Sequence, residues 1–277
     1  HLQDATPIRL GQEFSGYASM VEHARRRLEK VKSPLGELAL GGTAVGTGIN
    51  THPRFARLVA QKISRMTGLA FREAENHFEA QGSKDGVVEA SGALKATAAG
   101  LMKIANDIRW LGSGPRCGIG EILIPPAQPG SSIMPGKVNP VIPEALCMVC
   151  AQVIGNDLTV TVAGMSGNFE LNVMMPLMAY NLLQSIRLLA NAVEVFTEKC
   201  VIGLKADVDR CREMIEKSLA MVTALSPRIG HERAAELAKE AYRTGRTVRE
   251  VARQKSVLPP KELEKILDPW RMTEPGL

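Results

Sequence analysis

Apolar residues recur at helical spacing along nearly the whole of this 277-residue chain, and this periodicity restricts the fold more than any other feature. The pattern predicts long helices over 12–32, 53–67, 84–111, 140–163 and 171–198. Aromatic residues make up only 4% of the chain, whereas methionine is frequent, with 12 copies. Such side chains suit helix-on-helix packing better than a strand-rich sandwich. We therefore predict an all-α protein built around a bundle of long helices.

Two of these stretches show how the bundle is expected to pack. In 84–111 the apolar residues form a stripe at spacings of three, four and seven, made by Val87, Leu94, Leu101, Ile104 and Ile108. The stretch 171–198 is apolar on almost every face and is expected to kink at Pro176. A helix that is apolar all round must be covered on all sides. The sequence therefore predicts that several subunits share one core.

The pattern changes at about Asp207, where the predicted helices become shorter and more charged. They cover 207–222, 231–243, 247–254 and 260–267. We therefore expect a central helical-bundle domain over 1–206 and a small C-terminal helical domain over 207–277.

Charge and cysteine content exclude several classes of protein. The net charge of +5 is spread along the chain, and the densest run, Arg25-Arg26-Arg27, falls within an amphipathic helix pattern. Because no aromatic or glycine-rich recognition motif accompanies it, a solvated helix face is favoured over a nucleic-acid site. The odd number of cysteines, 5, favours reduced thiols, and Cys147-x-x-Cys150 is best explained as a packed pair.

The sequence shows neither a signal peptide nor a membrane span. Its most apolar run, 171–195, is interrupted by polar residues such as Asn181 and Ser185. A cytoplasmic protein is therefore expected. The first residues, His1-Leu2-Gln3-Asp4, have no Met and no targeting character, so we expect the interior of a longer protein.

The chemistry is concentrated in one loop, Gly130-Ser131-Ser132-Ile133-Met134-Pro135-Gly136-Lys137-Val138-Asn139-Pro140. Its glycines let backbone amides approach a ligand closely, and its hydroxyl, ammonium and carboxamide groups suit a carboxylate. Asn139 is expected to cap the next helix, with Pro140 as its first residue. The positive end of that helix would add to the attraction. From the residues alone, an ordinary surface loop explains the segment equally well.

This loop closely resembles the signature of the fumarase/aspartase superfamily. Further similar stretches cover nearly the whole chain, and several of them resemble the class II fumarases. These stretches are His1–Pro7, Gly41–Asn50, Asn76–Ala80, Ser113–Arg116 and Gly167–Asn172.

The resemblance implies a role for individual residues. Ser131 would be the catalytic base, and Ser132, Lys137, Val138 and Asn139 would contact the substrate. His1 would be the active-site histidine, and Glu144 its carboxylate partner, which orients the ring. The alternative explanation of Glu144 is a carboxylate that complements a helix dipole, and from the residues alone His1 is only a terminal residue.

The resemblance also implies an activity, namely reversible hydration of fumarate to (S)-malate through an aci-carboxylate carbanion, without a metal or other cofactor. The expected assembly is a homotetramer with sites built from three subunits and a small dicarboxylate as substrate, with no nucleic-acid or membrane partner. The family's N-terminal part, which supplies further substrate-binding groups, is absent from the sequence. We therefore expect the chain to be inactive on its own.

Two alternatives to this activity remain open. Aspartate ammonia-lyase uses the same carbanion chemistry on the amino analogue, although Pro129-Gly130, Gly136 and the Asn76–Ala80 stretch look more like fumarase. A non-catalytic scaffold is the other alternative, against which the retention of Ser131, Lys137, Asn139 and Glu144 argues. An assay of malate against aspartate separates the two enzymes, and an activity assay combined with size-exclusion chromatography tests the scaffold.

Overall fold

The computed structural model describes residues 1–128, 130 and 133–276. These residues form two compact units. One, here called the bundle unit, comprises Ala18–Arg109 and Ile124–Gly203, and the other, the terminal unit, comprises His1–Tyr17, Trp110–Leu123 and Leu204–Leu277.

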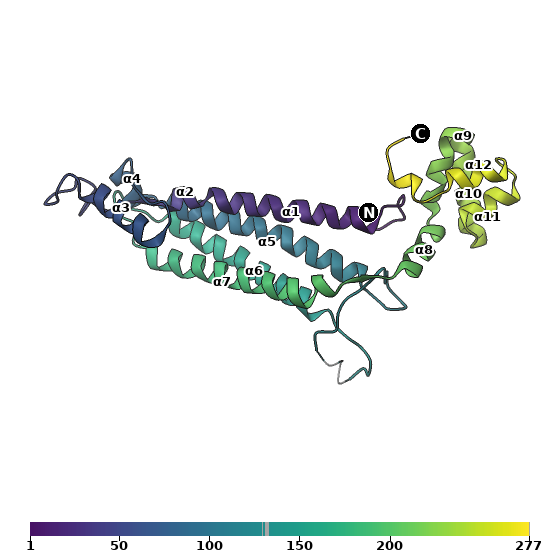
Figure 1. Ribbon diagram of the computed structural model, residues 1–277, viewed down its shortest axis with the longest axis horizontal. Coiled ribbons are helices and arrows are strands. Elements are labelled where there is room, and N and C mark those ends of the chain that lie inside the picture. Colours follow the sequence, from purple (N-terminus) through teal and green to yellow (C-terminus); the bar gives the residue numbers. More distant parts are fainter. Residues whose placement is uncertain (129, 131–132, 277) are drawn as a thin grey trace. The chain divides into compact units, whose positions relative to one another are not determined.

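Long helices lying side by side dominate the structure, which confirms the all-α prediction (Figure 1). The four longest are α1 (Leu10–Lys30), α5 (Asp85–Leu111), α6 (Val141–Gly164) and α7 (Met175–Lys199). The apolar stripe predicted on α5 is largely buried, since Leu94, Leu101, Ile104 and Ile108 all lie in the core. Periodicity therefore identified both the helix and the face that it buries.

Short elements join α1 to α5, and most of them were not predicted. They are α2 (Lys32–Leu35), β1 (Glu37–Leu38), α3 (Phe55–Thr67), β2 (Arg72–Glu73) and α4 (His77–Gly82). Strands β1 and β2 pair in parallel, with Glu37 opposite Arg72. The Asn76 side chain caps α4 by accepting hydrogen bonds from the amides of Phe78 and Glu79.

Both helices after the polar loop begin later than predicted. Helix α6 starts at Val141, and Pro140, not Asn139, is the N-cap residue, without a capping side chain. Helix α7 starts at Met175, so Pro176 lies in its first turn. A proline there has no helical carbonyl partner to lose. The predicted kink at Pro176 is therefore wrong, because this residue starts the helix and does not interrupt it.

The turn between α6 and α7 is built around Asn172, which is fully buried. Its Nδ2 donates to the carbonyls of Ala163 and Gly164, at 3.0 and 3.4 Å, and its Oδ1 accepts from the amide of Met174 at 2.9 Å. One side chain thus provides hydrogen-bond partners for the backbone groups at the C-terminal end of α6 and just before α7.

The polar residues that interrupt the apolar sequence of α7 bond to α6. Asn156 of α6 donates from Nδ2 to Gln184 Oε1 at 2.9 Å and to Ser185 Oγ at 3.0 Å. Asn156 and Ser185 are buried, so these bonds satisfy groups that would otherwise be costly to bury.

Helices α6 and α7 nevertheless leave many apolar side chains exposed. The most exposed on α6 are Met148, Leu158 and Val162, and α7 exposes Leu177, Tyr180, Leu183 and Ile186. Helix α6 has a mean hydropathy of 1.5 over 18 residues and is the one helix in the described chain long and apolar enough to cross a membrane. Helix α6 is more apolar than the 171–195 run, which was expected to be the most apolar part of the chain. This is weak support for a membrane span, because the core helix of a bundle meets the same criterion and α6 packs extensively against α7.

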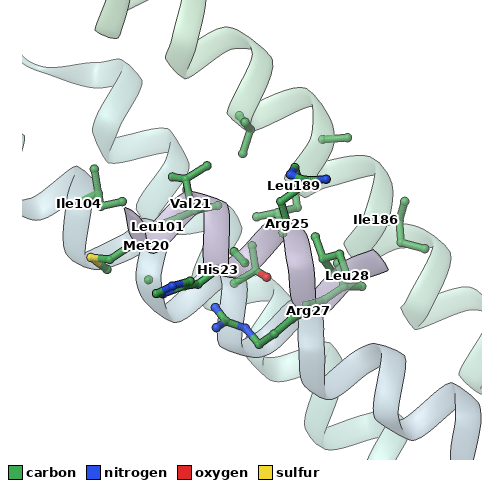
Figure 2. Close-up of a pocket in the computed structure, with 16 residues that line it drawn as sticks. Met20, Val21, His23, Arg25, Arg27, Leu28, Leu101, Ile104, Ile186 and Leu189 are labelled. Atoms are coloured by element: carbon green, nitrogen blue, oxygen red, sulfur yellow. The ribbon is translucent and has the colours of Figure 1, made fainter. Parts of the chain in front are cut away.

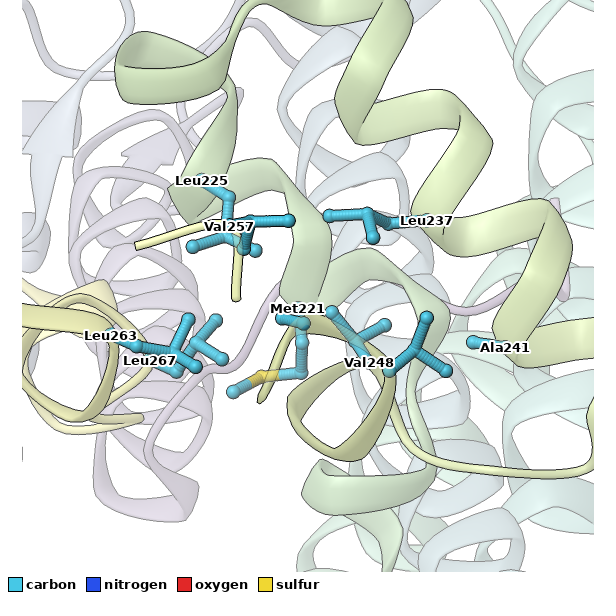
Figure 3. Close-up of a cluster of buried hydrophobic side chains, with 10 residues drawn as sticks. Met221, Leu225, Leu237, Ala241, Val248, Val257, Leu263 and Leu267 are labelled. Carbon is cyan, nitrogen blue, oxygen red and sulfur yellow. The ribbon is translucent and has the colours of Figure 1, made fainter. Parts of the chain in front are cut away.

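The terminal unit contains a small helical core near the C-terminus. Element η1 (Val201–Gly203) is the last part of the bundle unit. The elements of the terminal unit are β4 (Lys205–Ala206), which pairs with β3 (Ile122–Leu123), and then α8 (Val208–Lys217), η2 (Leu219–Leu225), α9 (Ser226–Ile229), α10 (His231–Thr244), α11 (Val248–Gln254), α12 (Pro260–Ile266) and η3 (Arg271–Thr273). Figure 3 shows its buried cluster, in which Leu225, Leu237 and Leu263 point toward a common centre.

The helix predicted over 207–222 is two elements. It breaks at Ser218, whose backbone is extended and whose hydroxyl accepts from the amide of Ala220 at 3.2 Å. A serine that bonds its own neighbouring backbone competes with the helix, so α8 ends at Lys217 and η2 begins.

Two smaller expectations concern surface charge and cysteine. Arg25 and Arg26 both pair with Glu22, and these hydrogen bonds lower the pKa of that carboxyl to about 2. Arg25, Arg26 and Arg27 are all exposed, as predicted for a solvated helix face. All five cysteines are free thiols, in agreement with the sequence-based prediction.

Candidate active site

The polar loop turns sharply just before α6. The amide of Lys137 donates to the carbonyl of Met134 at 3.1 Å, and Gly136 adopts a left-handed backbone with φ of +80°. A proline followed by a glycine at the two central positions is the sequence that a type II turn requires. The loop also closes on itself, since a Cβ on Gly130 would lie only 3.0 Å from the carbonyl oxygen of Lys137.

Three of the predicted substrate-binding residues lie in the described part of this loop. Lys137 and Val138 are exposed, and Asn139 is half-buried. The carbonyl of Asn139 accepts from the amide of Val141 at 2.9 Å, so the loop leads directly into α6. Lys137 and Asn139 therefore lie in the loop that leads into the positive end of a 24-residue helix. The predicted Ser131 and Ser132 lie outside the described residues.

Glu144 is in the first turn of α6, as expected, but its neighbour was not predicted. Its Oε1 lies 3.6 Å from Nη2 of Arg109, at the end of α5. Arg109 also donates from Nη1 to Asn106 Oδ1 at 2.9 Å, and Asn106 is 3.6 Å from the Cys147 sulfur. The end of α5 and the start of α6 thus share a polar cluster.

Arg109 is a residue of this cluster for which the sequence favoured a structural role over substrate binding. Its Nε is buried and has no hydrogen-bond partner among the described residues. The sequence feature that points to Arg109 is its position three residues after Asn106, on the α5 face that meets α6. That face could be identified only once the pairing of α5 with α6 was known.

His1 lies in the terminal unit and is exposed, whereas Glu144 belongs to the bundle unit. The predicted pairing of these two residues therefore stays a prediction. No group of three or more His, Cys, Asp or Glu side chains suited to a metal ion is found among the described residues.

The bundle unit also has an apolar groove, of about 480 Å³, but its chemistry differs from that of the loop (Figure 2). Its walls come from α1, α5 and α7. Figure 2 shows Met20, Leu28, Leu101 and Leu189 lining it, with Arg25 and Arg27 also drawn around it. Such a lining offers few groups that could polarise a substrate, so the loop before α6 remains the better candidate for catalysis.

Family models match two parts of this helical chain. A family model described as "Lyase" matches residues 1–155, and a second, described as "Fumarase C C-terminus", matches residues 221–274. The chain belongs to this lyase family, and the relatives that it resembles within the family are class II fumarate hydratases.

Among these relatives, the class II fumarate hydratase of Neisseria meningitidis serogroup A is 55% identical over 275 residues, and that of Bacillus cereus is 54% identical over 275 residues. Each alignment covers 99% of this chain and 60% of the relative. The chain therefore spans about three fifths of the length of these relatives.

Solved structures give the same result. A protein from Brucella melitensis, described as fumarate lyase:delta crystallin bound to cobalt, superposes with a TM-score of 0.94 at 50% identity, covering 99% of this chain and 60% of that one. A class II fumarase from Schistosoma mansoni superposes with a TM-score of 0.92 at 38% identity, with the same coverage of both chains.

Proposed function

We propose that this chain carries the catalytic loop of a class II fumarate hydratase, which hydrates fumarate reversibly to (S)-malate. The observation that carries the proposal is the loop before α6, where the Lys137 ammonium and the Asn139 carboxamide stand at the start of a long helix. The identity of the chain to class II fumarate hydratases from several bacteria supports the same substrate, a small dicarboxylate.

The proposed chemistry begins with Ser131. In the direction of dehydration, its alkoxide removes a proton from the carbon next to one malate carboxylate. The electron pair spreads into that carboxylate and gives an aci-carboxylate with two negative charges on its oxygens. Lys137 and Asn139 stabilise this charge through an ion pair and a hydrogen bond that strengthen as it develops.

The second half of the reaction expels the hydroxyl group from the neighbouring carbon. The electron pair of the aci-carboxylate forms the double bond of fumarate, and the departing hydroxide takes a proton from an acid and leaves as water. We assign the active-site histidine role to His1, with Glu144 as its carboxylate partner. Ser132 and Val138 complete the substrate contacts.

Arg109 also contacts a residue of the proposed site. Its guanidinium is 3.6 Å from Glu144, which lies in the first turn of the helix that follows the loop. A cation there can pair with the Glu144 carboxylate and hold that side chain in place.

We infer that the protein works as a homotetramer in the cytoplasm, with sites shared between subunits. The exposed apolar side chains of α6 and α7 support an assembly in which these helices pack against other copies. The free thiols support a reducing compartment. We retain the division into a bundle domain over 1–206 and a C-terminal domain over 207–277, which the separate buried cluster within 221–267 supports.

The test is a substrate comparison. The chain is assayed alone and mixed with a separately prepared N-terminal segment of a class II fumarate hydratase, with (S)-malate or aspartate as the substrate. Fumarate formation is followed by ultraviolet absorbance. We expect the mixture, and not the chain alone, to turn over malate, and we expect no turnover of aspartate. Turnover of aspartate alone would assign the ammonia-lyase activity instead, and a stable oligomer inert toward both would assign a scaffold.

A further inference from the structure

The segment that precedes α1 is held by contacts from the far end of the chain. Residues 1–8 form no helix or strand, and seven of these eight residues are exposed. A segment without a core of its own keeps one conformation only if other elements fix it. In the terminal unit two separate sets of contacts do so.

The first set joins the segment to the start of η2. Asp4 Oδ2 accepts a hydrogen bond from the amide of Leu219 at 3.2 Å. Ser218 donates from Oγ to the carbonyl of Ala5 at 3.0 Å, while the same hydroxyl accepts from the amide of Ala220. Two consecutive residues of the segment are thus bound by two consecutive residues of the C-terminal part of the chain.

The second set fastens the start of α1 to the last residues of the chain. Arg9 Nη2 pairs with Glu274 Oε1 at 2.6 Å, and the guanidinium lies 4.8 Å from the centre of the Trp270 ring. Gln12 donates from Nε2 to the carbonyl of Thr273 at 3.0 Å. Residues 6–8 are therefore fixed on both sides by the C-terminal part of the chain.

Behind Asp4 there is space instead of a packed core. Gln3 and Asp4 line a cavity of about 650 Å³, whose other walls include Lys217, Tyr242 and Arg246. Because little side-chain packing supports this part of the segment, its position depends on the hydrogen bonds to Leu219 and Ser218.

We propose that Asp4 and Ser218 are positioning residues for His1, through which the C-terminal helical domain sets the place of the active-site histidine. The inference rests on the proposed function, because it needs His1 to act in catalysis. His1 is three residues before Asp4, so loss of the Asp4 contact releases the chain on which the imidazole is carried. A catalytic group displaced by about 1 Å can cost up to about 100-fold in rate.

The first experiment needs no activity. The amide of Leu219 donates to the Asp4 carboxylate, so its hydrogen-exchange rate, measured by NMR, reports this contact directly. We expect exchange to be about fivefold faster in Asp4→Ala, and close to the wild-type rate in Asp4→Asn, which keeps an acceptor oxygen. Asp209→Ala removes an exposed carboxylate from α8 and is the matched control.

The second experiment measures malate turnover in the mixture with the separately prepared N-terminal segment. We expect kcat to fall about 10- to 100-fold in Asp4→Ala and Ser218→Ala, with KM changed less than about twofold. Asp4→Asn and Ser218→Thr should restore most of kcat, because each keeps its hydrogen-bonding group. A merely structural role would not produce this split or this rescue.

The outcomes distinguish failure of the positioning role from failure of the proposed function. Unchanged exchange at Leu219 in Asp4→Ala, or unchanged kcat with an active wild-type mixture, overturns the positioning role. If the wild-type mixture turns over neither substrate, the proposed function fails. Even in that case, equal hydrogen-exchange rates of residues 1–5 in Asp4→Ala and wild type would overturn the claim that Asp4 holds this segment in place.

Discussion

Burial raises the pKa of the Cys150 and Cys200 thiols to about 11, and for Cys150 the neighbouring Cys147 adds to the effect. Because the thiolate is the reactive form, these two cysteines should resist iodoacetamide at pH 8. Cys117 is exposed and should be alkylated first. Mass spectrometry of the labelled protein before and after unfolding tests this. Rapid labelling of Cys150 in the folded chain would contradict it.

The same shift predicts how stability depends on pH. A thiol in the unfolded chain ionises near its ordinary pKa of about 8.5, whereas the buried thiols keep their protons up to about pH 11. Between these values the folded state binds more protons, so its free energy of unfolding falls as pH rises. Urea denaturation from pH 8 to pH 10.5 measures the slope. The slope should be smaller in Cys150→Ala, which lacks one of the two groups.

Asn172 should be the most sensitive polar position in the turn between α6 and α7. Its replacement by Ala removes two donors to the end of α6 and one acceptor for Met174. We expect a loss of about 2–3 kcal/mol in the free energy of unfolding, because these groups stay buried without partners. Asn168→Ala, at an exposed asparagine in the same turn, is the control and should cost far less.

At the residue scale, the choice of site residues from the sequence rests on a motif, and their roles stay a prediction. Lys137, Asn139 and Glu144 could be chosen because the loop and the helix after it are contiguous in sequence. Arg109 could not be chosen in this way, since it meets Glu144 only through the packing of α5 against α6. The amino-acid sequence does not encode that register in any local pattern.

At the scale of elements, helix interiors were predictable and helix ends were not. The 3.6-residue period located α1, α3, α5, α6 and α7 to within a few residues at each end. Where a helix begins depends on single residues: the Ser218 hydroxyl bonds the first turn of η2, whereas α6 begins after Pro140 without a capping side chain. The strands have two residues each, which is too short for any alternation to be read.

The effect of replacing a glycine by alanine also depends on packing, and two glycines are expected to respond in opposite directions. A Cβ on Gly82 would lie 2.3 Å from the backbone carbonyl oxygen of Phe169, so Gly82→Ala forces apart α4 and the α6–α7 turn. We expect a loss of about 1–3 kcal/mol. Gly16 lies within α1 with nothing within 4 Å of its Cβ position, so Gly16→Ala should stabilise by about 0.5–1 kcal/mol. Equal midpoints in urea for the two variants would refute this account.

At the scale of the whole molecule, the exposed apolar faces of α6 and α7 predict self-association. Leu158 is 66% exposed on α6, and a glutamate there would bring a charge into any interface formed by this face. Leu158→Glu should therefore sediment as a smaller species than the wild-type chain. Met66→Glu, at a methionine of α3 that is 74% exposed, serves as control and should leave the assembly intact. Identical sedimentation of wild type and Leu158→Glu would contradict the proposed interface.

The central claim is that the loop before α6 performs the chemistry of fumarate hydration. Its most direct test is the rate of fumarate formation from (S)-malate by the chain mixed with the separately prepared N-terminal segment, compared between wild type and Ser131→Ala. The account predicts turnover by the wild type and a loss of about 100-fold or more in kcat for Ser131→Ala, with Gly16→Ala unaffected. Equal turnover by wild type and Ser131→Ala would contradict it, because the base would then lie elsewhere.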